Sequence, residues 1–212
     1  MKKIMAVCLI LVLTTLCTVG YAKENISDIV GYWEENNAGD FVYYNKTMNL
    51  KFDVGQWRYY KDAEKYAENA HMSLSAWKKS MQTDLENGEF CEVMMCVSNN
   101  KQLFVTIHVA DYTENTLFNS SSYENLDLLA NMLKNGVESA LDNILDIDVE
   151  TITFMKEKTP CVKVRYIDSN NTECYIVFIN VINNGYLARI RIESEKQDKT
   201  ANVASKFSKI HK

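Results

Sequence analysis

Proline and glycine are scarce in this sequence: its 212 residues include one proline and seven glycines. Flexible linkers between domains are rich in these residues or in serine, and no such tract, internal repeat or low-complexity segment divides the chain. The sequence therefore indicates a single domain. The roughly 190 residues that follow an N-terminal leader are enough to bury a sizeable core.

Histidine is also scarce, and the common catalytic and metal-binding motifs are missing. None of the three histidines, His71, His108 and His211, stands at a metal-ligand spacing from another histidine or a cysteine. The sequence also lacks C-x-x-C, H-E-x-x-H, G-x-S-x-G and a phosphate-binding glycine loop. We therefore predict no catalytic residue, metal site or cofactor, and we expect that the protein is not an enzyme.

Two groups of residues could form a catalytic or a metal site, but each has a simpler structural interpretation. Cys91 or Cys96 could act as a nucleophile with His108 on a neighbouring strand, but we expect these to be core residues. An acidic string could bind Ca²⁺ through its oxygen atoms and consists of Asp142, Asp146, Asp148 and Glu150. The string lacks the D-x-D-x-D-G order and a turn glycine, so we interpret it as a solvated acidic corner.

The N-terminus has the features of a signal peptide. Lys2 and Lys3 form a basic start, an apolar run follows, and small residues precede a cut after Ala22. We expect residues 1–22 to be removed and residues 23–212 to form one exported bacterial domain, secreted or held in the cell envelope. The alternative is that the apolar run is kept as a membrane anchor.

The exported part is predicted to be acidic. The sequence has 23 basic and 28 acidic residues. Removing residues 1–22 takes away two lysines and no acid, which leaves 21 basic residues and a net charge of −7. This charge argues against nucleic acid or an anionic membrane as a partner. No later apolar run reaches the roughly 20 residues that span a bilayer.

Four cysteines remain after the cut, and we expect free, largely buried thiols. Cys91 and Cys96 lie in one extended run. Cys161 lies about 20 Å along its strand from the position expected opposite Cys174, and a disulfide allows a Cα separation of only about 7 Å. Cross-pairs such as Cys91 with Cys174 stay open.

The last third of the chain predicts an antiparallel meander. Its strands are Ile152–Phe154, Cys161–Ile167, Cys174–Ile182 and Tyr186–Ile192. Asn184-Gly185 is typical of a two-residue type I′ turn, because both positions of that turn need a positive φ. This turn places Val181 opposite Ala188, and alternation then sets the rest of the register.

The preceding turn is predicted to contain four residues, 169–172, with Asp168 opposite Glu173 and Val164 opposite Val177. In this register four cations share one face of the sheet: Lys163, Arg165, Arg189 and Arg191. We interpret them as a candidate anion-binding surface. The alternative is that their stems cover apolar surface while their charged ends pair with acids from a helix.

Upstream, hairpins alternate with amphipathic helices. Hairpins are predicted within 41–54 and 90–109, and helices over Asp62–Asn69, Ser73–Asn87, 121–145 and, with Val203, Phe207 and Ile210 facing inward, 198–210. Trp57, Tyr59 and Tyr60 form an aromatic cluster between them. We interpret it as a plug at the end of the core, with a stacking platform for sugar or peptide as the alternative.

This order of elements resembles the PsbP-like family, whose fold is shared with the Mog-type Ran-binding proteins. The matching residues are Tyr43-Tyr44-Asn45, Leu50-Lys51-Phe52, Trp57, Gly185 to Ile190, and the closing "S-F-x-x-I" segment Lys206 to Ile210. Val54-Gly55 stands where the family often has proline. The resemblance implies an α+β fold, an α/β/α sandwich in which an antiparallel sheet of about six or more strands lies between helices. It also implies a non-enzymatic role with a protein, a complex or an ion.

These observations lead us to expect an exported, non-enzymatic binding or assembly module whose partner is another protein or an anionic ligand outside the cell. In the assembly version, the Trp57 cluster would dock the partner. A secreted hydrolase that uses acidic residues is the alternative, because carboxylates are the only plentiful catalytic groups.

Overall fold

The computed structural model describes residues 25–57, 59–112 and 123–210. The predicted signal peptide, most of the predicted loop at 111–120 and His211 lie outside the described residues. No helix within the described ranges is long and apolar enough to cross a membrane.

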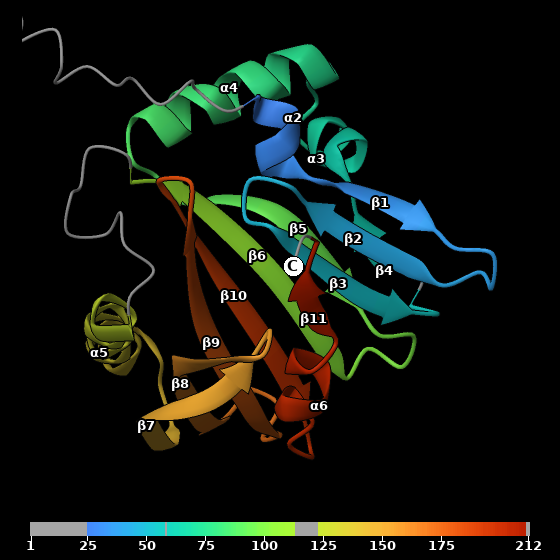
Figure 1. Cartoon of the computed structure of the whole chain (residues 1–212). Helices are drawn as coiled ribbons and strands as arrows, with labels where there is room; N and C mark the ends of the chain where they lie inside the picture. The colour runs from blue at the N-terminus through green and yellow to red at the C-terminus, as the bar shows by residue number, and fades with distance from the viewer. Residues whose placement is uncertain (1–24, 58, 113–122, 211–212) are drawn as a thin grey trace, which may run out of the picture.

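Two antiparallel sheets form the framework (Figure 1). The small sheet has the order β1-β2-β3-β11, with β1 at Tyr32–Glu35, β2 at Phe41–Asn45, β3 at Leu50–Gly55 and β11 at Phe207–Lys209. The large sheet has the order β4-β5-β6-β10-β9-β8-β7. Its strands are β4 (Tyr59–Lys61), β5 (Cys91–Val97), β6 (Leu103–Asp111), β7 (Ile144–Phe154), β8 (Glu157–Ile167), β9 (Glu173–Asn183) and β10 (Tyr186–Glu195). The predicted α+β class and an antiparallel sheet of six or more strands are confirmed.

The helices are α2 (Ile26–Val30), α3 (Ala63–Asn69), α4 (Leu74–Glu86), α5 (Tyr123–Ala140) and α6 (Thr200–Ala204). The helices predicted at Asp62–Asn69 and Ser73–Asn87 are confirmed as α3 and α4. The Asp62 side chain accepts a hydrogen bond from the amide of Lys65, and the Ser73 hydroxyl accepts one from the amide of Ala76. These bonds satisfy amide groups that the first helical turn leaves free.

The main core lies between the two sheets. Leu50 and Phe52 of β3 are fully buried there against Ile190 and Ile192 of β10, and α2, α4 and α6 also contribute to this core. We call this side of the large sheet its inner face. The outer face is covered by α5 over β7, β8 and β9, where Val164 and other apolar residues form a second, smaller cluster. Figure 1 shows α5 and the small sheet on opposite sides of the large sheet.

The predicted register of the last hairpin is confirmed. Asn184 and Gly185 have φ values of 51° and 77°, as a type I′ turn requires. Val181 faces Ala188, and Ile179 faces Ile190.

The predicted register of the preceding hairpin is wrong by one residue. Asp168 and Thr172 close a three-residue loop, with Asn171 left-handed at φ 60°. The Asp168 carboxylate accepts hydrogen bonds from the amides of Asn170 and Thr172 and fixes this shorter loop. Val164 therefore faces Ile176 instead of Val177. Because side chains alternate with period two, every side chain of β8 moves to the opposite face from the one predicted.

Two predicted helices are shorter than expected. The helix at 121–145 ends at Ala140, and β7 begins at Ile144 after Asn143, which has a φ of 56°. The closing helix is limited to the five residues of α6. Phe207 instead belongs to β11, because its ring stacks on Phe52 at 4.1 Å and the strand pairs with the edge of β3. The family's closing helix is therefore absent at Phe207–Lys209.

Candidate functional site

The predicted cationic surface does not exist as one surface. Lys163 and Arg165 lie on the inner-face side of β8, whereas Arg189 and Arg191 lie on the outer face of β10. Lys163 Nζ is 2.7 Å from Glu150, and Arg165 Nε is 3.6 Å from Glu173. The one-residue shift of the β8–β9 register is the cause of this separation.

The two arginines of β10 instead join a row of half-buried polar side chains across three neighbouring strands. We name this row the outer-face strip. It consists of Glu92 from β5, Thr106 and His108 from β6, and Arg189, Arg191 and Glu193 from β10. In the ladder His108 lies between Glu92 and Arg189, and Thr106 lies beside Arg191. The residues of β10 are thus about 80 to 100 positions from those of β5 and β6 in the sequence, and strand pairing brings them together.

One end of the strip is a carboxylate with two donors. The Tyr166 hydroxyl donates to Glu193 Oε1 at 2.6 Å, and Arg191 Nη2 donates to Glu193 Oε2. Burial and then Glu193 raise the pKa of Tyr166, so its hydroxyl stays protonated and can keep donating. Glu193 is thus held by both neighbours.

The other end is a chain of three side chains. The Tyr66 hydroxyl donates to Glu92 Oε1 at 2.8 Å, and Glu92 Oε2 lies 3.6 Å from His108 Nε2. Burial lowers the pKa of His108; Glu92 opposes this shift, and Arg189 and Arg191 add to it. Since the ordinary value is about 6.5, His108 is neutral at pH 7.

Arg189, at the centre of the strip, has no acidic partner within ion-pair distance in the described part of the chain. Its guanidinium lies 4.4 Å from the centre of the Phe90 ring, and its Nε donates to Asn180 Oδ1 at 3.5 Å. Burial lowers the pKa of Arg189. Beside it, Arg191 Nε and Thr106 Oγ1 are buried without a hydrogen-bond partner among the described residues.

The predicted aromatic cluster is divided between different neighbours. Trp57 lies edge-on to Phe52 at 6.3 Å, whereas Tyr60 packs on Trp33 at 4.7 Å. Both side chains are half-buried against the main core. Tyr59 pairs with Val97 through its backbone, and its side chain lies outside the described part. The position of Trp57 and Tyr60 favours the plug over a shared stacking platform.

The possible catalytic pair of Cys91 or Cys96 with His108 is not formed. Cys91 and Cys96 pair with Val109 and Val105 and share their inner face, whereas His108 points to the outer face. The cysteine and histidine side chains are therefore separated by the sheet. Burial raises the pKa of Cys91 to about 11, which further disfavours a thiolate. All four described cysteines are free.

The acidic string lies on and just before β7 instead of at a helix end. Glu150 pairs with Lys163, and Asp148 lies 3.7 Å from Lys134. Within the described ranges no group of three or more His, Cys, Asp or Glu side chains is placed to hold a metal ion.

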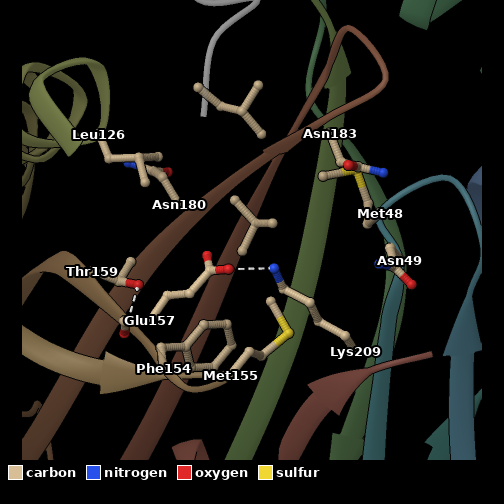
Figure 2. A pocket seen from close by; sticks show the side chains of 12 residues that line it. Met48, Asn49, Leu126, Phe154, Met155, Glu157, Thr159, Asn180, Asn183 and Lys209 are labelled. Carbon is tan, nitrogen blue, oxygen red and sulfur yellow. Dashed lines mark hydrogen bonds and ion pairs between the residues drawn. The ribbon is translucent and has the colours of Figure 1, made fainter. Parts of the chain in front are cut away.

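A pocket of about 130 Å³ opens where β8 separates from β9, and we name it the fork pocket (Figure 2). Half of its described lining residues are apolar, namely Met48, Leu126, Phe154, Met155, Val181 and Ile182, and the other half are polar. Figure 2 shows Glu157 and Lys209 meeting across it as an ion pair. Glu157 is the only carboxylate among its described lining residues, so these residues do not supply the pair of acids that a glycosidase-type hydrolase needs.

Sequence reasoning missed Glu92, Thr106 and Asn180, and it missed the pocket. Thr106 and His108 alternate with the apolar residues of β6, so their face could be read from the sequence. Their neighbours could not, because no local signal says that β6 pairs with β10. The pocket had one sequence signal, the single proline at 160 inside a strand.

No protein-family model and no curated protein matches this chain.

Proposed function

We propose that this protein is an exported, non-enzymatic binding module whose outer-face strip holds an anionic group of its ligand, a carboxylate or a phosphate. The observation that carries the proposal is Arg189. This guanidinium is half-buried and has no acidic partner in the described part of the chain. We therefore retain Arg189 and Arg191 as anion-binding residues, and we no longer assign this role to Lys163 and Arg165.

The physical argument is the cost of a poorly compensated charge. A guanidinium stays protonated at any pH that proteins meet, and partly burying it without a counter-charge is unfavourable. An oxyanion beside Arg189 would supply that charge. Arg191 lies two residues along the same face with its side chain 41% exposed, so two guanidinium groups can approach one ligand, in the geometry that suits carboxylates and phosphates.

A binding role agrees better with the strip than catalysis does. The Thr106 hydroxyl has no hydrogen bond to His108, so the strip lacks the nucleophile–base contact of a hydrolytic site. Among the described residues, the fork pocket offers one carboxylate, which is ion-paired. No observation favours the hydrolase alternative.

We propose that residues 1–22 direct export, that the module acts outside the cytoplasmic membrane, and that its fold is related to the PsbP-like family. The family relation is supported by Tyr43-Tyr44-Asn45 within β2 and Leu50-Lys51-Phe52 within β3. It is weakened by β11, which replaces the family's closing helix, and by the main core, which packs sheet on sheet.

The test measures anion binding by calorimetry with residues 23–212, using phosphate and glutarate as probes at constant ionic strength. Arg189→Gln should raise the Kd at least tenfold, because a charge-assisted hydrogen bond contributes about 1.5–3 kcal/mol. The matched control is Arg165→Gln, which removes a cation that is already paired on the other face. Equal Kd values for both variants and the wild type would contradict the proposal.

A further inference from the structure

The large sheet divides at the only proline of the chain. The β8–β9 ladder ends at Cys161 opposite Ile179, although β9 continues to Asn183 and β8 begins at Glu157. Pro160 would stand next, opposite Asn180, and it has no amide hydrogen to donate. Residues 157–160 pair with β7 alone, and Glu157 at their start is bound by Lys209 of β11. The β7–β8 hairpin is thus drawn away from β9.

The division leaves the last residues of β9 with an open edge. Asn183 and Tyr186 flank the two-residue turn and pair with each other, so the hydrogen bonds of β9 to β10 alternate from there. The N–H and C=O of Ile182 therefore point away from β10, toward the fork pocket. β8 does not pair with β9 beyond Ile179, and no turn or loop hydrogen bond from another described residue reaches either group. The carbonyl of Asn180 faces the same way, toward a proline that cannot donate.

The pocket beside this edge is lined by side chains from both faces of the large sheet. Leu126 and Ile182 line it on the outer-face side, and Met48, Phe154 and Val181 line it on the inner-face side. Its volume of about 130 Å³ is below the roughly 300–1,000 Å³ of sites for drug-sized ligands. The space suits an aliphatic side chain better than a cofactor.

The charges around the pocket favour an uncharged occupant. Its ionic groups, Glu157 and Lys209, neutralise each other, and its other polar side chains are amides and a hydroxyl, including Asn180, Asn183 and Thr159. A charged side chain placed here would lose its hydration without gaining a counter-charge. Met155-Lys156 at its rim is the two-residue turn that joins β7 to β8, and its φ values of 48° and 71° are those that a type I′ turn requires.

We propose that the fork pocket is a strand-addition site for an uncharged, extended segment of a partner protein. The segment pairs with the N–H and C=O of Ile182 and with the carbonyl of Asn180, and it places an aliphatic side chain in the pocket. The proposal does not require anion binding by the outer-face strip, although Asn180 of this site accepts a hydrogen bond from Arg189.

The test follows amide signals of ¹⁵N-labelled residues 23–212 by NMR during titration with the peptide acetyl-TVTVT-amide. Two matched peptides carry N-methyl groups either on both valines or on all three threonines. Because successive amides of an extended strand point in opposite directions, one methylated peptide should keep the parent affinity and the other should bind at least tenfold more weakly. The Ile182 signal should be among those that shift.

Three results would overturn the proposal: no saturable shift at about 5 mM peptide, a concentration that reveals even millimolar affinity, equal binding of both methylated peptides, or shifts confined to other regions. Arg191→Gln separates the two proposals, because Arg191 is hydrogen-bonded to Glu193 and not to a residue of the fork pocket. This change should weaken phosphate binding and leave the peptide titration unchanged. An unchanged phosphate titration with normal peptide binding would reject the anion site alone.

Discussion

At the scale of single residues, His108 gives the outer-face strip a pH dependence. Its pKa in the folded chain is lowered, first by burial, so below about pH 6.5 the unfolded chain binds a proton more readily than the folded chain does. The stability contributed by neutral His108 is therefore present above that pH and is lost as the pH falls through it toward the folded pKa. We expect the free energy of unfolding to decrease more between pH 7.5 and 5.5 in the wild type than in His108→Gln.

The difference should be a few tenths of a kcal/mol, because the His108 side chain is 34% exposed and solvent screens its interactions. Urea denaturation at several pH values measures it. The groups that face His108 are Glu92, Arg189 and Arg191, and they are kept in the variant. His71→Gln is the matched control, since His71 is exposed and should follow the wild type. Parallel pH curves for His108→Gln and the wild type would contradict this prediction.

Single residues also decide how much of the meander could be predicted. Asn184-Gly185 fits one turn geometry, so its hairpin was predicted with the observed register. The residues between Asp168 and Glu173 fit several turns, and the choice is made by the Asp168 carboxylate, which accepts two amide hydrogen bonds. That hydrogen bonding is not visible in a pattern of residue types. Because the predicted register of β8 against β9 is wrong by one residue, the four cations predicted to share one face lie on two faces of the sheet.

At the scale of elements, β11 joins the C-terminus to the main core. The Phe207 ring stacks on Phe52 and lies 5.3 Å from the Phe154 ring, and the residue is 4% exposed. Phe207→Ala should lower the free energy of unfolding by about 3–5 kcal/mol, the usual cost of removing a buried phenylalanine ring. Ser208→Ala on the same strand should change it by about 0.5 kcal/mol or less. Urea denaturation measures both, and a similar small effect of the two changes would show that β11 is not anchored by its ring.

Helical periodicity failed where tertiary contacts choose the element. Val203, Phe207 and Ile210 have a helical spacing, yet the three residues of β11 pair with an edge of β3 that would otherwise stay open. Leu141 and Ile144 continue the stripe of α5, and both pack on the same cluster as α5 does. Their spacing correctly indicated the apolar cluster that they join, but it wrongly predicted that they continue the helix. Type and length of these elements depend on neighbours distant in sequence.

At the scale of the whole molecule, one side chain links the two proposed sites. Asn180 lines the fork pocket and accepts a hydrogen bond from Arg189 of the outer-face strip. Both sites are therefore built on the same part of the β9–β10 hairpin, which was the best predicted part of the fold. The chemistry around it comes from β6, α5 and β11, whose positions are set by long-range pairing. The sequence could thus indicate the β9–β10 hairpin, but not the residues of β6, α5 and β11 that complete the two sites.

The shared core predicts that the two sheets unfold together. Phe52 of the small sheet and Ile190 of the large sheet belong to one buried cluster, so separating the sheets would expose the apolar surface of both. The three tryptophans, Trp33, Trp57 and Trp77, all pack against the margin of this cluster. Their fluorescence reports on that part, whereas far-UV circular dichroism reports on the backbone of the whole chain.

We expect the urea transitions followed by these two signals to have the same midpoint and slope, as a single cooperative unit requires. Phe207→Ala should move both midpoints to lower urea by the same amount, because its ring belongs to the core that the two sheets share. A fluorescence transition that precedes the circular dichroism transition, in the wild type or in the variant, would show that the small sheet separates first. The two sheets would then be independent units, and the main core would not be what joins them.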